Sequence, residues 1–460
     1  MKKFAINSTL AYLRYFAKKA LVKHQPTIIG IAGSVGKSST RKAIEAVLID
    51  HFPTKSVGNS ETGIPLGILG MQPENYSPFD WLKMLAKSPL NIDYLENTQY
   101  LIAEMGIDEP DPPKNMDYLL SILQPDIAIS LNVSATHSLQ FDKTIKKEGL
   151  SQEDRLKEVI TKIAEEDTKI ITKSHCKVGI YNADDKDVTS QIDGKELSSK
   201  LLTFGTKSTC DISYGLYRVS LKGSSFDFFV KMNNKREEIN LTFSRHILPR
   251  EYREVFAASI LVGIEAGLTL EQIKVSLEKN YQPPKGRASI FEGIHKSIII
   301  DSTYNASKAS ISTFLDMIDI LKKETNREVS FLLGDMRELG DESKIEHEQV
   351  AGQLIGIVDY LYLVGPLTRE FVLPIIQENE KNFKEVRWFD SSFRAGEYLK
   401  DNLPKETLLL AKGSQNTIFL EEAIKQILED KKDSKNLCRQ EDFWHKLKSS
   451  PKNSGPLVSQ

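Results

Sequence analysis

Short apolar runs alternate with longer helical stretches along most of the chain. In the first 200 residues the predicted strands are Thr27–Ala32, Tyr100–Glu104, Asp126–Leu131, Lys169–Thr172 and Val178–Tyr181. Short strands separated by helical segments are typical of a mostly parallel sheet. Between Leu201 and Ile247 apolar and polar positions alternate instead, as in Ile212–Val219 and Ser225–Val230. This alternation predicts an antiparallel patch.

A second series of strands follows a Pro-Pro-Lys-Gly linker that ends at Gly286. These predicted strands are Ser297–Asp301, Val329–Leu333, Tyr360–Val364, Val386–Phe389 and Leu408–Ala411. They alternate with helices, as in an open doubly wound, Rossmann-like α/β domain. The predicted fold class is therefore α/β. A central, mostly parallel-sheet domain with an antiparallel patch (26–285) precedes a Rossmann-like C-terminal domain (286–430), and we expect most of the polar tail (431–460) to be poorly ordered.

The first 25 residues combine basic charge with helical spacing of apolar positions. No acidic residue precedes Glu45, and the basic positions are Lys2, Lys3, Arg14, Lys18, Lys19 and Lys23. The pattern predicts a basic amphipathic helix over 1–25 that ends at Pro26. Two roles remain open for it: packing on the next domain, or contact of residues 1–24 with a membrane surface or a partner.

Composition gives no sign of a nucleic-acid-binding or membrane-spanning protein. A chain of 460 residues with 40% hydrophobic residues can bury several cores. The net charge of -2 gives no argument for a nucleic-acid partner. Three widely spaced cysteines fit a reducing cytoplasm, and no apolar run reaches the roughly 18 residues of a membrane span. We expect a cytoplasmic enzyme, with peripheral contact at the inner face of the membrane if the N-terminal helix binds there.

The strand that ends at Ala32 runs into a glycine-rich turn and then a helix. The turn reads Gly-Ser-Val-Gly-Lys-Ser-Ser-Thr over residues 33–40. Glycines let backbone N–H groups approach an anion at a helix N-terminus, Lys37 can bridge outer phosphates, and the Ser38 hydroxyl can ligate Mg²⁺. The motif therefore predicts ATP binding with Mg²⁺. The expected nucleotide-binding residues here are Gly33, Ser34, Gly36, Lys37, Ser38 and Ser39.

Two further side chains are predicted to lie at the same sheet edge. Glu104 ends a buried strand, and His137 follows the strand that ends at Leu131. The carboxyl ends of parallel strands form the ligand crevice of an open α/β sheet, so both residues are expected beside the phosphate loop. A carboxylate and an imidazole there could hold Mg²⁺.

Nine motifs in a fixed order resemble those of the Mur ligase family, the ATP-dependent amide ligases of peptidoglycan synthesis. The motifs occupy residues 33–40, 59–66, 104–106, 132–137, 182–185, 286–287, 301–306, 334–340 and 412–414. Tyr-Asn-Ala and Gly-Asp-Met-Arg-Glu-Leu-Gly are most similar to the family members that add D-alanyl-D-alanine to a UDP-muramoyl-tripeptide. The resemblance runs from about residue 26 to 430.

The resemblance implies roles for individual residues. Catalytic roles would belong to Lys37, His137 and Arg287, and Ser38, Glu104 and His137 would hold Mg²⁺. Asp301, Tyr304 and Asn305 would belong to motifs that bring the C-terminal domain onto the nucleotide. In the family a carboxylate attacks the γ-phosphate of ATP, and an amine then displaces phosphate from the acyl phosphate. The implied partners are ATP, a muropeptide-like carboxylate acceptor and an amino-acid or dipeptide amine.

Several positions depart from the family pattern. The chain has only the basic helix where the family has an N-terminal domain that grips uridine diphosphate. Glu254 replaces an asparagine near the adenine, and Gln415 replaces an arginine. The lysine that the family carbamylates to bridge Mg²⁺ aligns with Asp167, predicted here as a metal ligand; a solvent-facing aspartate is the structural alternative. Lys162 and Lys169 are rival candidates if the alignment slips by one helical turn.

The sequence therefore predicts an ATP- and Mg²⁺-dependent amide ligase, with D-alanyl-D-alanine addition as its leading specificity. Two alternatives stay open. The chain could be a related ligase that acts on another carboxylate, such as a lipid-linked muropeptide or a polyglutamate chain. It could also be a non-catalytic ATP-binding partner of a cell-wall enzyme.

Overall fold

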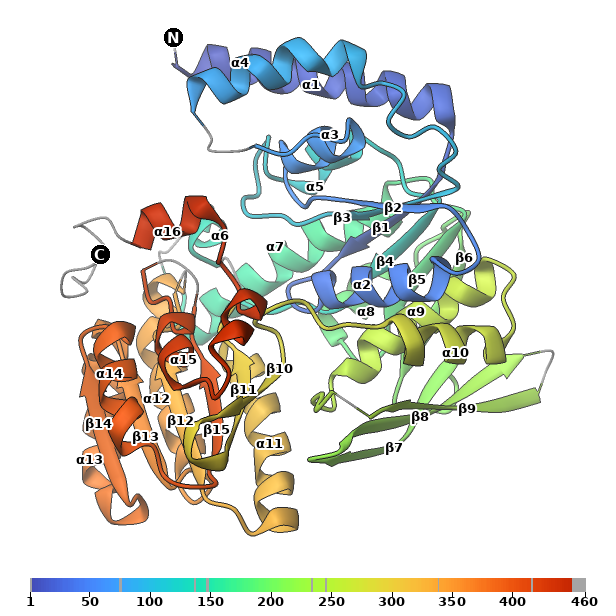
Figure 1. The fold of residues 1–460 in the computed structure, drawn as a ribbon. Helices are drawn as coiled ribbons and strands as arrows, with labels where there is room; N and C mark the ends of the chain where they lie inside the picture. Colours follow the sequence, from blue (N-terminus) through green and yellow to red (C-terminus); the bar gives the residue numbers. More distant parts are fainter. Residues whose placement is uncertain are drawn as a thin grey trace. The chain divides into compact units, whose positions relative to one another are not determined.

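The computed structural model describes residues 2–73, 77–135, 138–145, 149–232, 235–244, 246–337, 339–414 and 417–448 (Figure 1). The chain divides into two compact units. The first comprises Met1–Leu216, Phe226–Leu241 and Tyr252–Gln282, and the second comprises Tyr217–Ser225, Thr242–Glu251 and Pro283–Gln460. None of the helices in the described ranges is both long and apolar enough to cross a bilayer.

The first large sheet has nine strands in the order β2-β3-β1-β4-β5-β6-β7-β8-β9. The strands are β1 (Thr27–Ala32), β2 (Thr54–Val57), β3 (Tyr100–Glu104), β4 (Ile127–Ser130), β5 (Val178–Asn182), β6 (Lys200–Gly205), β7 (Ile212–Ser220), β8 (Gly223–Met232) and β9 (Lys235–Phe243). From β2 to β6 all neighbours pair in parallel. Only two residues join β7 to its neighbour β8, which is too short for a parallel crossover. The predicted parallel sheet with an antiparallel patch is confirmed.

Strand β1 is central because the chain winds away from it in both directions. Its neighbours are β3 and β4, and its carboxyl end therefore lies between theirs. The helices of this part are α1 (Lys2–His24), α2 (Lys37–Leu48), α3 (Gly63–Ile68), α4 (Pro78–Lys87), α5 (Met116–Leu120), α6 (Ser138–Asp142), α7 (Gln152–Thr172), α8 (Lys186–Ile192), α9 (Tyr252–Glu265) and α10 (Leu270–Asn280), with the 3₁₀ turn η1 (Ser88–Leu90) after α4. In open α/β sheets the ligand crevice lies where the strand order reverses, which in this sheet is at the carboxyl end of β1.

The predicted strand Lys169–Thr172 is wrong, because these residues form the last turn of α7. The Ser151 side chain caps this helix by accepting from the Asp154 N–H. Its buried positions, which include Val159, Ile163 and Ile170, recur at helical spacing. The pair Ile170–Ile171 looks like a strand only when it is considered apart from the rest of the 21-residue helix.

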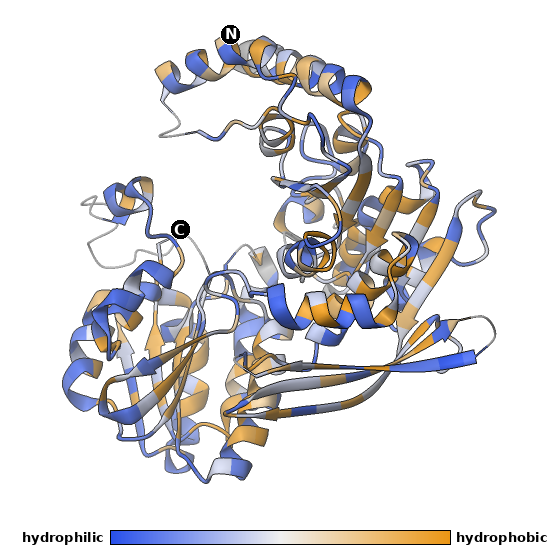
Figure 2. Cartoon of the chain, turned by 45° about the vertical axis from the view of Figure 1, so that its right-hand side comes forward, coloured by the Kyte–Doolittle hydropathy of each residue, from blue (hydrophilic) through white to orange (hydrophobic). Residues whose placement is uncertain are grey.

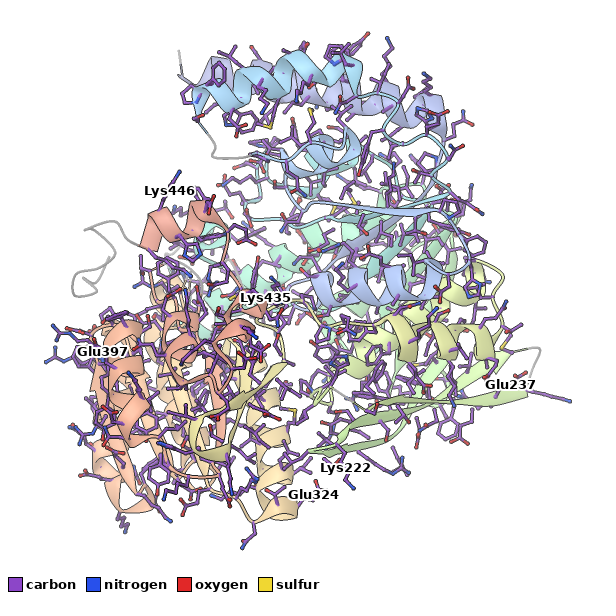
Figure 3. The ribbon with its side chains drawn as sticks, viewed as in Figure 1. Lys222, Glu237, Glu324, Glu397, Lys435 and Lys446 are labelled. Atoms are coloured by element: carbon purple, nitrogen blue, oxygen red, sulfur yellow. The ribbon has the colours of Figure 1, made fainter. Side chains whose placement is uncertain are left out.

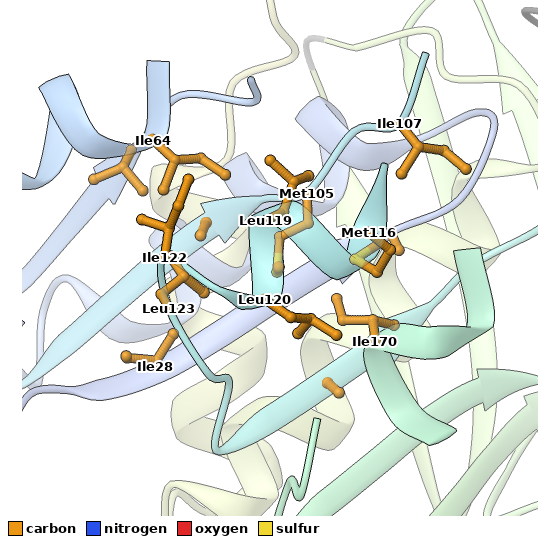
Figure 4. Close-up of a cluster of buried hydrophobic side chains, with 14 of the residues drawn as sticks. Ile28, Ile64, Met105, Ile107, Met116, Leu119, Leu120, Ile122, Leu123 and Ile170 are labelled. Carbon is orange, nitrogen blue, oxygen red and sulfur yellow. The ribbon is translucent and has the colours of Figure 1, made fainter. Parts of the chain in front are cut away.

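The core of the first unit joins β1, β3 and β4 to the helices that cover them. Ile28, Met105, Leu119 and Ile170 belong to one buried cluster (Figure 4). Gly30 lies at a crowded point, since a Cβ there would be 3.0 Å from both the Ile170 side chain and the Met105 sulfur. Helix α7 is therefore packed directly against the middle of β1, and a larger residue at position 30 would force these layers apart.

Helix α1 packs on the first unit, as one of the two alternatives for residues 1–25 proposed. Leu13, Ala17 and Ala20 are fully buried in the same core cluster. The Arg14 guanidinium donates to the Ser121 hydroxyl at 2.9 Å and lies over the ring of Tyr118. One face of this basic helix is thus buried against the first unit.

The second sheet has six strands in the order β10-β11-β15-β12-β13-β14. They are β10 (Ser289–Gly293), β11 (Ser297–Ser302), β12 (Val329–Gly334), β13 (Tyr360–Val364), β14 (Glu385–Phe389) and β15 (Leu408–Lys412). All pairs are parallel except β10–β11. The longer helices are α11 (Lys308–Thr325), α12 (Ser343–Leu354), α14 (Ser392–Asn402) and α15 (Glu421–Ile427). The predicted Rossmann-like second sheet is confirmed, and β10 is an added edge strand.

The polar segment after residue 430 is structured up to Lys448, so the expectation of a poorly ordered tail is wrong for that part. It forms the 3₁₀ helix η6 (Lys431–Asn436) and helix α16 (Asp442–Lys448), where Figure 3 labels Lys435 and Lys446. Leu437, Cys438 and Arg439 between these helices are buried. Polar composition concealed this short buried stretch. The rest of the predicted tail, 449–460, lies outside the described residues.

Candidate active site

The predicted phosphate loop connects β1 to α2 through two glycines with positive φ. Gly33 has φ 132°, and a Cβ there would be 3.0 Å from the Leu131 Cβ and 3.1 Å from the Asn132 N. Gly36, with φ 95°, precedes α2, and no side chain caps the first turn of this helix. The N-terminal N–H groups of α2 are therefore not capped by a side chain, which is the arrangement that binds phosphate.

A short segment after β4 holds the loop in shape. The Asn132 carbonyl accepts from the Ser34 N–H at 2.8 Å, and its side-chain oxygen accepts from the Val35 N–H at 2.9 Å. The Ser134 N–H donates to the Ser34 hydroxyl at 2.9 Å. The Asn132 amide also donates to Glu254 on α9 at 3.0 Å. Asn132 therefore braces the loop, a role that the sequence analysis missed although an asparagine directly after a strand of this sheet was the available signal.

Lys37 is bent back over the loop that it follows. Its ammonium donates to the Gly33 carbonyl and, at 3.4 Å, to the Ser34 carbonyl. The lysine stem passes Gly106, where a Cβ would lie 3.6 Å from Lys37 Cε and 3.3 Å from the Asn59 carbonyl. Three separate motifs thus converge at this point, and the lysine is half-buried with its charge at the mouth of the loop.

Ser38 and Glu104 are brought together, as predicted for a magnesium site. The Ser38 hydroxyl donates to Glu104 Oε2 at 2.8 Å, and Arg41 Nε donates to Oε1 at 2.6 Å. Glu104 is only 5% exposed. Hydroxyl and carboxylate oxygens are the hard donors that Mg²⁺ prefers, so these two residues fit the ion. Arg41, one turn after Ser38, was not predicted, and here it balances the buried carboxylate.

The two other predicted metal ligands are His137 and Asp167. His137 lies outside the described residues, as does Gln415. Asp167 is on α7 and only 2% exposed, so the solvent-facing alternative for this residue is wrong. No group of three His, Cys, Asp or Glu side chains suited to a metal occurs within the described ranges. Among the described residues, Ser38 and Glu104 are the predicted ligands that a hydrogen bond joins directly.

The rival lysines on α7 are both held by other groups. Lys169 pairs with Glu166 and, at 2.8 Å, with Asp117. Lys162 donates to the Thr144 hydroxyl at 2.9 Å and to its carbonyl at 3.1 Å. An ammonium held by oxygen acceptors is poorly suited to carbamylation, which requires the neutral amine.

In the second unit, three motifs meet at the carboxyl ends of β11, β15 and β12. The Lys412 ammonium donates to the Ser302 hydroxyl at 3.1 Å and to the Asn305 carbonyl at 3.0 Å. The Ser414 N–H donates to the Asp335 carbonyl, and the Arg337 N–H donates to the Ser414 hydroxyl, both at 2.9 Å. Residues from 301–306, 334–340 and 412–414 therefore form one edge.

Buried charges at this edge have shifted pKa values. Asp301 is fully buried; its Oδ1 accepts from the Thr303 N–H and hydroxyl, and its Oδ2 has no hydrogen-bond partner among the described residues. Burial raises the pKa of Asp301 to about 6. Burial, together with the charge of Arg287, lowers the pKa of Lys412 to about 7. A buried polar atom without a partner is a natural contact point for a ligand.

The loop after β11 is held by the segment between η6 and α16. Arg439 donates to the Thr303 carbonyl at 2.7 Å and to the Tyr304 carbonyl at 3.2 Å. Glu421 on α15 accepts two hydrogen bonds from the same guanidinium. Arg287 lies over the Tyr304 ring, with its guanidinium carbon 4.5 Å from the centroid. Arg439 and Glu421 have no signal in the sequence, because they fall outside every recognisable motif.

The chain is similar to known Mur ligases. Residues 286–415 match the family model described as Mur ligase, glutamate ligase domain. The sequence is 25% identical to UDP-N-acetylmuramoyl-tripeptide–D-alanyl-D-alanine ligase of Bacillus subtilis, over 92% of this chain and 80% of that protein. The ligase of the same name from Rickettsia prowazekii is 24% identical, over 89% and 80% of the two chains. The resemblance seen in the motifs is thus confirmed at the level of whole sequences.

Solved structures agree on the fold. MurF ligase from Thermotoga maritima in complex with ADP has a TM-score of 0.68 and 20% identity, over 93% of this chain and 84% of that one. MurF from Acinetobacter baumannii has a TM-score of 0.67 and 20% identity, over 92% and 81%. The fold of this chain is therefore the Mur ligase fold.

We expect Lys37→Ala to lower ATP turnover on the order of 10²-fold or more, because a charge aimed at the phosphates is lost. The half-buried side chain contacts loop carbonyls, so the folded structure should persist. Turnover and circular dichroism of the purified variant test this expectation. Lys42→Ala is the matched control, since Lys42 lies on the same helix but pairs with Glu45 at 2.8 Å. Equal losses in both variants would contradict the assignment of the loop.

We expect the stability of the Asp301→Asn variant to depend less strongly on pH than the stability of the parent protein. The folded state holds the Asp301 proton more tightly than the unfolded state, because its pKa is about 6 instead of 3.8. In the parent the free energy of unfolding should therefore fall as pH rises through this window, and the variant should lack that fall. When pH rises from 4 to 7, the free energy of unfolding of the variant should therefore increase relative to that of the parent by on the order of 2 kcal/mol.

Urea unfolding in a Trp81→Phe background measures this effect, since Trp388 and Trp444 then report on the second unit. Parent and variant curves that stay parallel from pH 4 to 7 would show that Asp301 titrates normally.

Proposed function

We propose that this chain is an ATP-dependent ligase that forms an amide bond, adding D-alanyl-D-alanine to a UDP-muramoyl-tripeptide in peptidoglycan synthesis. The observation that carries the proposal is the contact of Ser38 with Glu104 beside a glycine loop at the start of α2. Such an edge suits a nucleotide triphosphate with Mg²⁺. The similar ligases of Bacillus subtilis and Rickettsia prowazekii suggest the substrate class.

The chemistry needs a way to bring two anions together. A substrate carboxylate oxygen attacks the γ-phosphorus of ATP, the bond to the β–γ bridging oxygen breaks, and ADP leaves. The amine nitrogen of the dipeptide then attacks the acyl carbon, inorganic phosphate leaves, and the amine loses a proton. Lys37 and the N–H groups of α2 would neutralise the phosphates, so that catalysis is mainly electrostatic and positional.

Magnesium would be held by Ser38 and Glu104, with His137 as a further ligand, and would supply positive charge to the phosphate oxygens. Arg41 donates to Oε1 of Glu104 and would keep the carboxylate oriented when the ion binds. Arg41 is therefore a positioning residue for the metal ligand.

The second unit would supply the remaining contacts to nucleotide and substrate. Arg287 is proposed as a catalytic cation, and its stacking on Tyr304 limits the directions its guanidinium can take. Asp301, Tyr304 and Asn305 are proposed to bind nucleotide. Lys412, whose pKa burial lowers to about 7, contacts the Asn305 carbonyl of this group.

Use of ATP and of a nucleotide-linked precursor supports a cytoplasmic location for the proposed enzyme. Contact of residues 1–24 with the inner face of the membrane stays a prediction.

The proposal is tested by measuring ADP release in the presence of different acceptors and amines. We expect release only when UDP-muramoyl-tripeptide and D-alanyl-D-alanine are both present, with an equal amount of amide product. Release with a lipid-linked muropeptide or a polyglutamate chain instead would replace the proposed acceptor. ATP binding without release under any combination would favour a non-catalytic partner of a cell-wall enzyme.

We further propose that Asp167 supplies permanently the carboxylate that the family obtains by carbamylating a lysine. Its near-complete burial on α7 and the engagement of Lys162 and Lys169 by other groups support this proposal. An aspartate stem is shorter than a carbamylated lysine, so a water would bridge Asp167 to the metal.

We expect ligation to be independent of CO₂. Depleting bicarbonate should leave the rate unchanged, and ¹³C-bicarbonate should give no carbamate signal in the NMR spectrum. Asp167→Asn should raise the Mg²⁺ concentration needed for half-maximal rate by about tenfold or more, as for other residues that orient a metal. Activity that is lost on depletion and rescued by bicarbonate would overturn this proposal and favour Lys162 or Lys169.

A further inference from the structure

Helices α1 and α4 lie beside one another in the first unit (Figures 1 and 2). Both helices expose apolar side chains to solvent. On α4, Phe79 is 77% exposed and Leu82 is 65% exposed, and Leu90 in η1 is 80% exposed. On α1, Tyr15 is 62% exposed and Val22 is 72% exposed. We name these five residues, together with Lys18, Lys19 and Lys87, the α1–α4 surface.

The apolar residues of α4 are not required for its packing. Asp80, Met84 and Ser88, spaced four apart, already form its buried side. Phe79 and Leu82 project from other sides of the helix, where a protein with no partner would carry polar residues. Apolar groups gathered on a solvent-facing side mark an interaction surface.

The charges of the α1–α4 surface have a single sign. Lys18, Lys19 and Lys87 are exposed, and α1 contains no acidic residue. The only acidic residue of α4, Asp80, is buried. Asp93, which follows η1, already accepts from Lys23 and from His24. The surface therefore attracts anions.

We propose that the α1–α4 surface binds an anionic lipid bilayer. Aromatic and aliphatic side chains would enter the headgroup region, while the lysines would contact lipid phosphates. A second copy of the chain fits poorly, because a two-fold contact would bring two copies of the same basic surface together, and like charges repel. The apolar half of this surface comes from α4, which the basic pattern of the first 25 residues does not reveal.

This proposal goes beyond the ligase activity and does not depend on it. Binding through α1 and α4 would hold the first unit at the membrane without using any residue of the phosphate loop. The two proposals can therefore fail separately, since vesicle binding is measured without substrates.

The experiment is sedimentation of the full chain with vesicles of phosphatidylcholine alone or with phosphatidylglycerol. We expect binding to the anionic vesicles that weakens at high salt. Lys18→Glu/Lys19→Glu should lower the partition coefficient by about tenfold or more, since each lysine near an anionic surface contributes on the order of 1 kcal/mol. Phe79→Ser/Leu82→Ser should lower the partition coefficient as well. This variant tests whether apolar side chains insert into the bilayer or whether the contact is purely electrostatic.

Lys381→Glu/Lys405→Glu is the matched control, because both lysines are exposed in the second unit and the charge change is identical. It should bind vesicles like the parent. Circular dichroism and ATP binding of each variant confirm its fold. Equal binding by parent and Lys18→Glu/Lys19→Glu, no binding to anionic vesicles, or equal losses in test and control variants would overturn the proposal. Self-association through α1 and α4 in place of vesicle binding would also overturn it.

Discussion

The buried carboxylate of Glu104 is the interaction on which the site of the first unit depends. Removing a carboxylate from water is costly unless charge and hydrogen bonds compensate it. Ser38 and Arg41, one turn apart on α2, provide both. The same contacts fix the start of α2 against the end of β3, and they thereby fix the loop between Gly33 and Gly36. The contacts that position the proposed metal ligands Ser38 and Glu104 therefore also position the loop.

The second unit manages its buried charge in two ways. Glu421 and Arg439 form a buried ion pair, and the guanidinium also donates to backbone carbonyls of the loop after β11. Asp301 and Lys412 lie on the neighbouring strands β11 and β15, and burial shifts both pKa values toward neutrality. The first pair stabilises the loop, whereas the second pair keeps groups that can still change charge when a ligand arrives.

Much of this protein is determined by local sequence. The strands that flank the phosphate loop, the glycines that form it and the pairing of Ser38 with Glu104 follow from apolar runs, spacing and the rule that parallel strands end at one edge. These inferences succeed because helix and strand periodicity are set by residues within a few positions of one another, and because strands that alternate with helices form a parallel sheet.

Only the tertiary structure decided the rest. The apolar end of α7 looks like a strand until the whole helix is packed. The sequence also leaves open whether Asp167 is a metal ligand or faces solvent, and the structure buries it. Contacts between segments far apart in the chain decide three further features. These are the hydrogen bonds of Asn132 to the phosphate loop, those of Arg439 to the loop after β11, and the exposed apolar side of α4. Burial and pairing are properties of such contacts, and neither composition nor spacing encodes which segment will supply the partner. The sequence by itself therefore determined the fold class and the chemistry of the phosphate loop, while long-range packing decided which charges are held and which surfaces are left exposed.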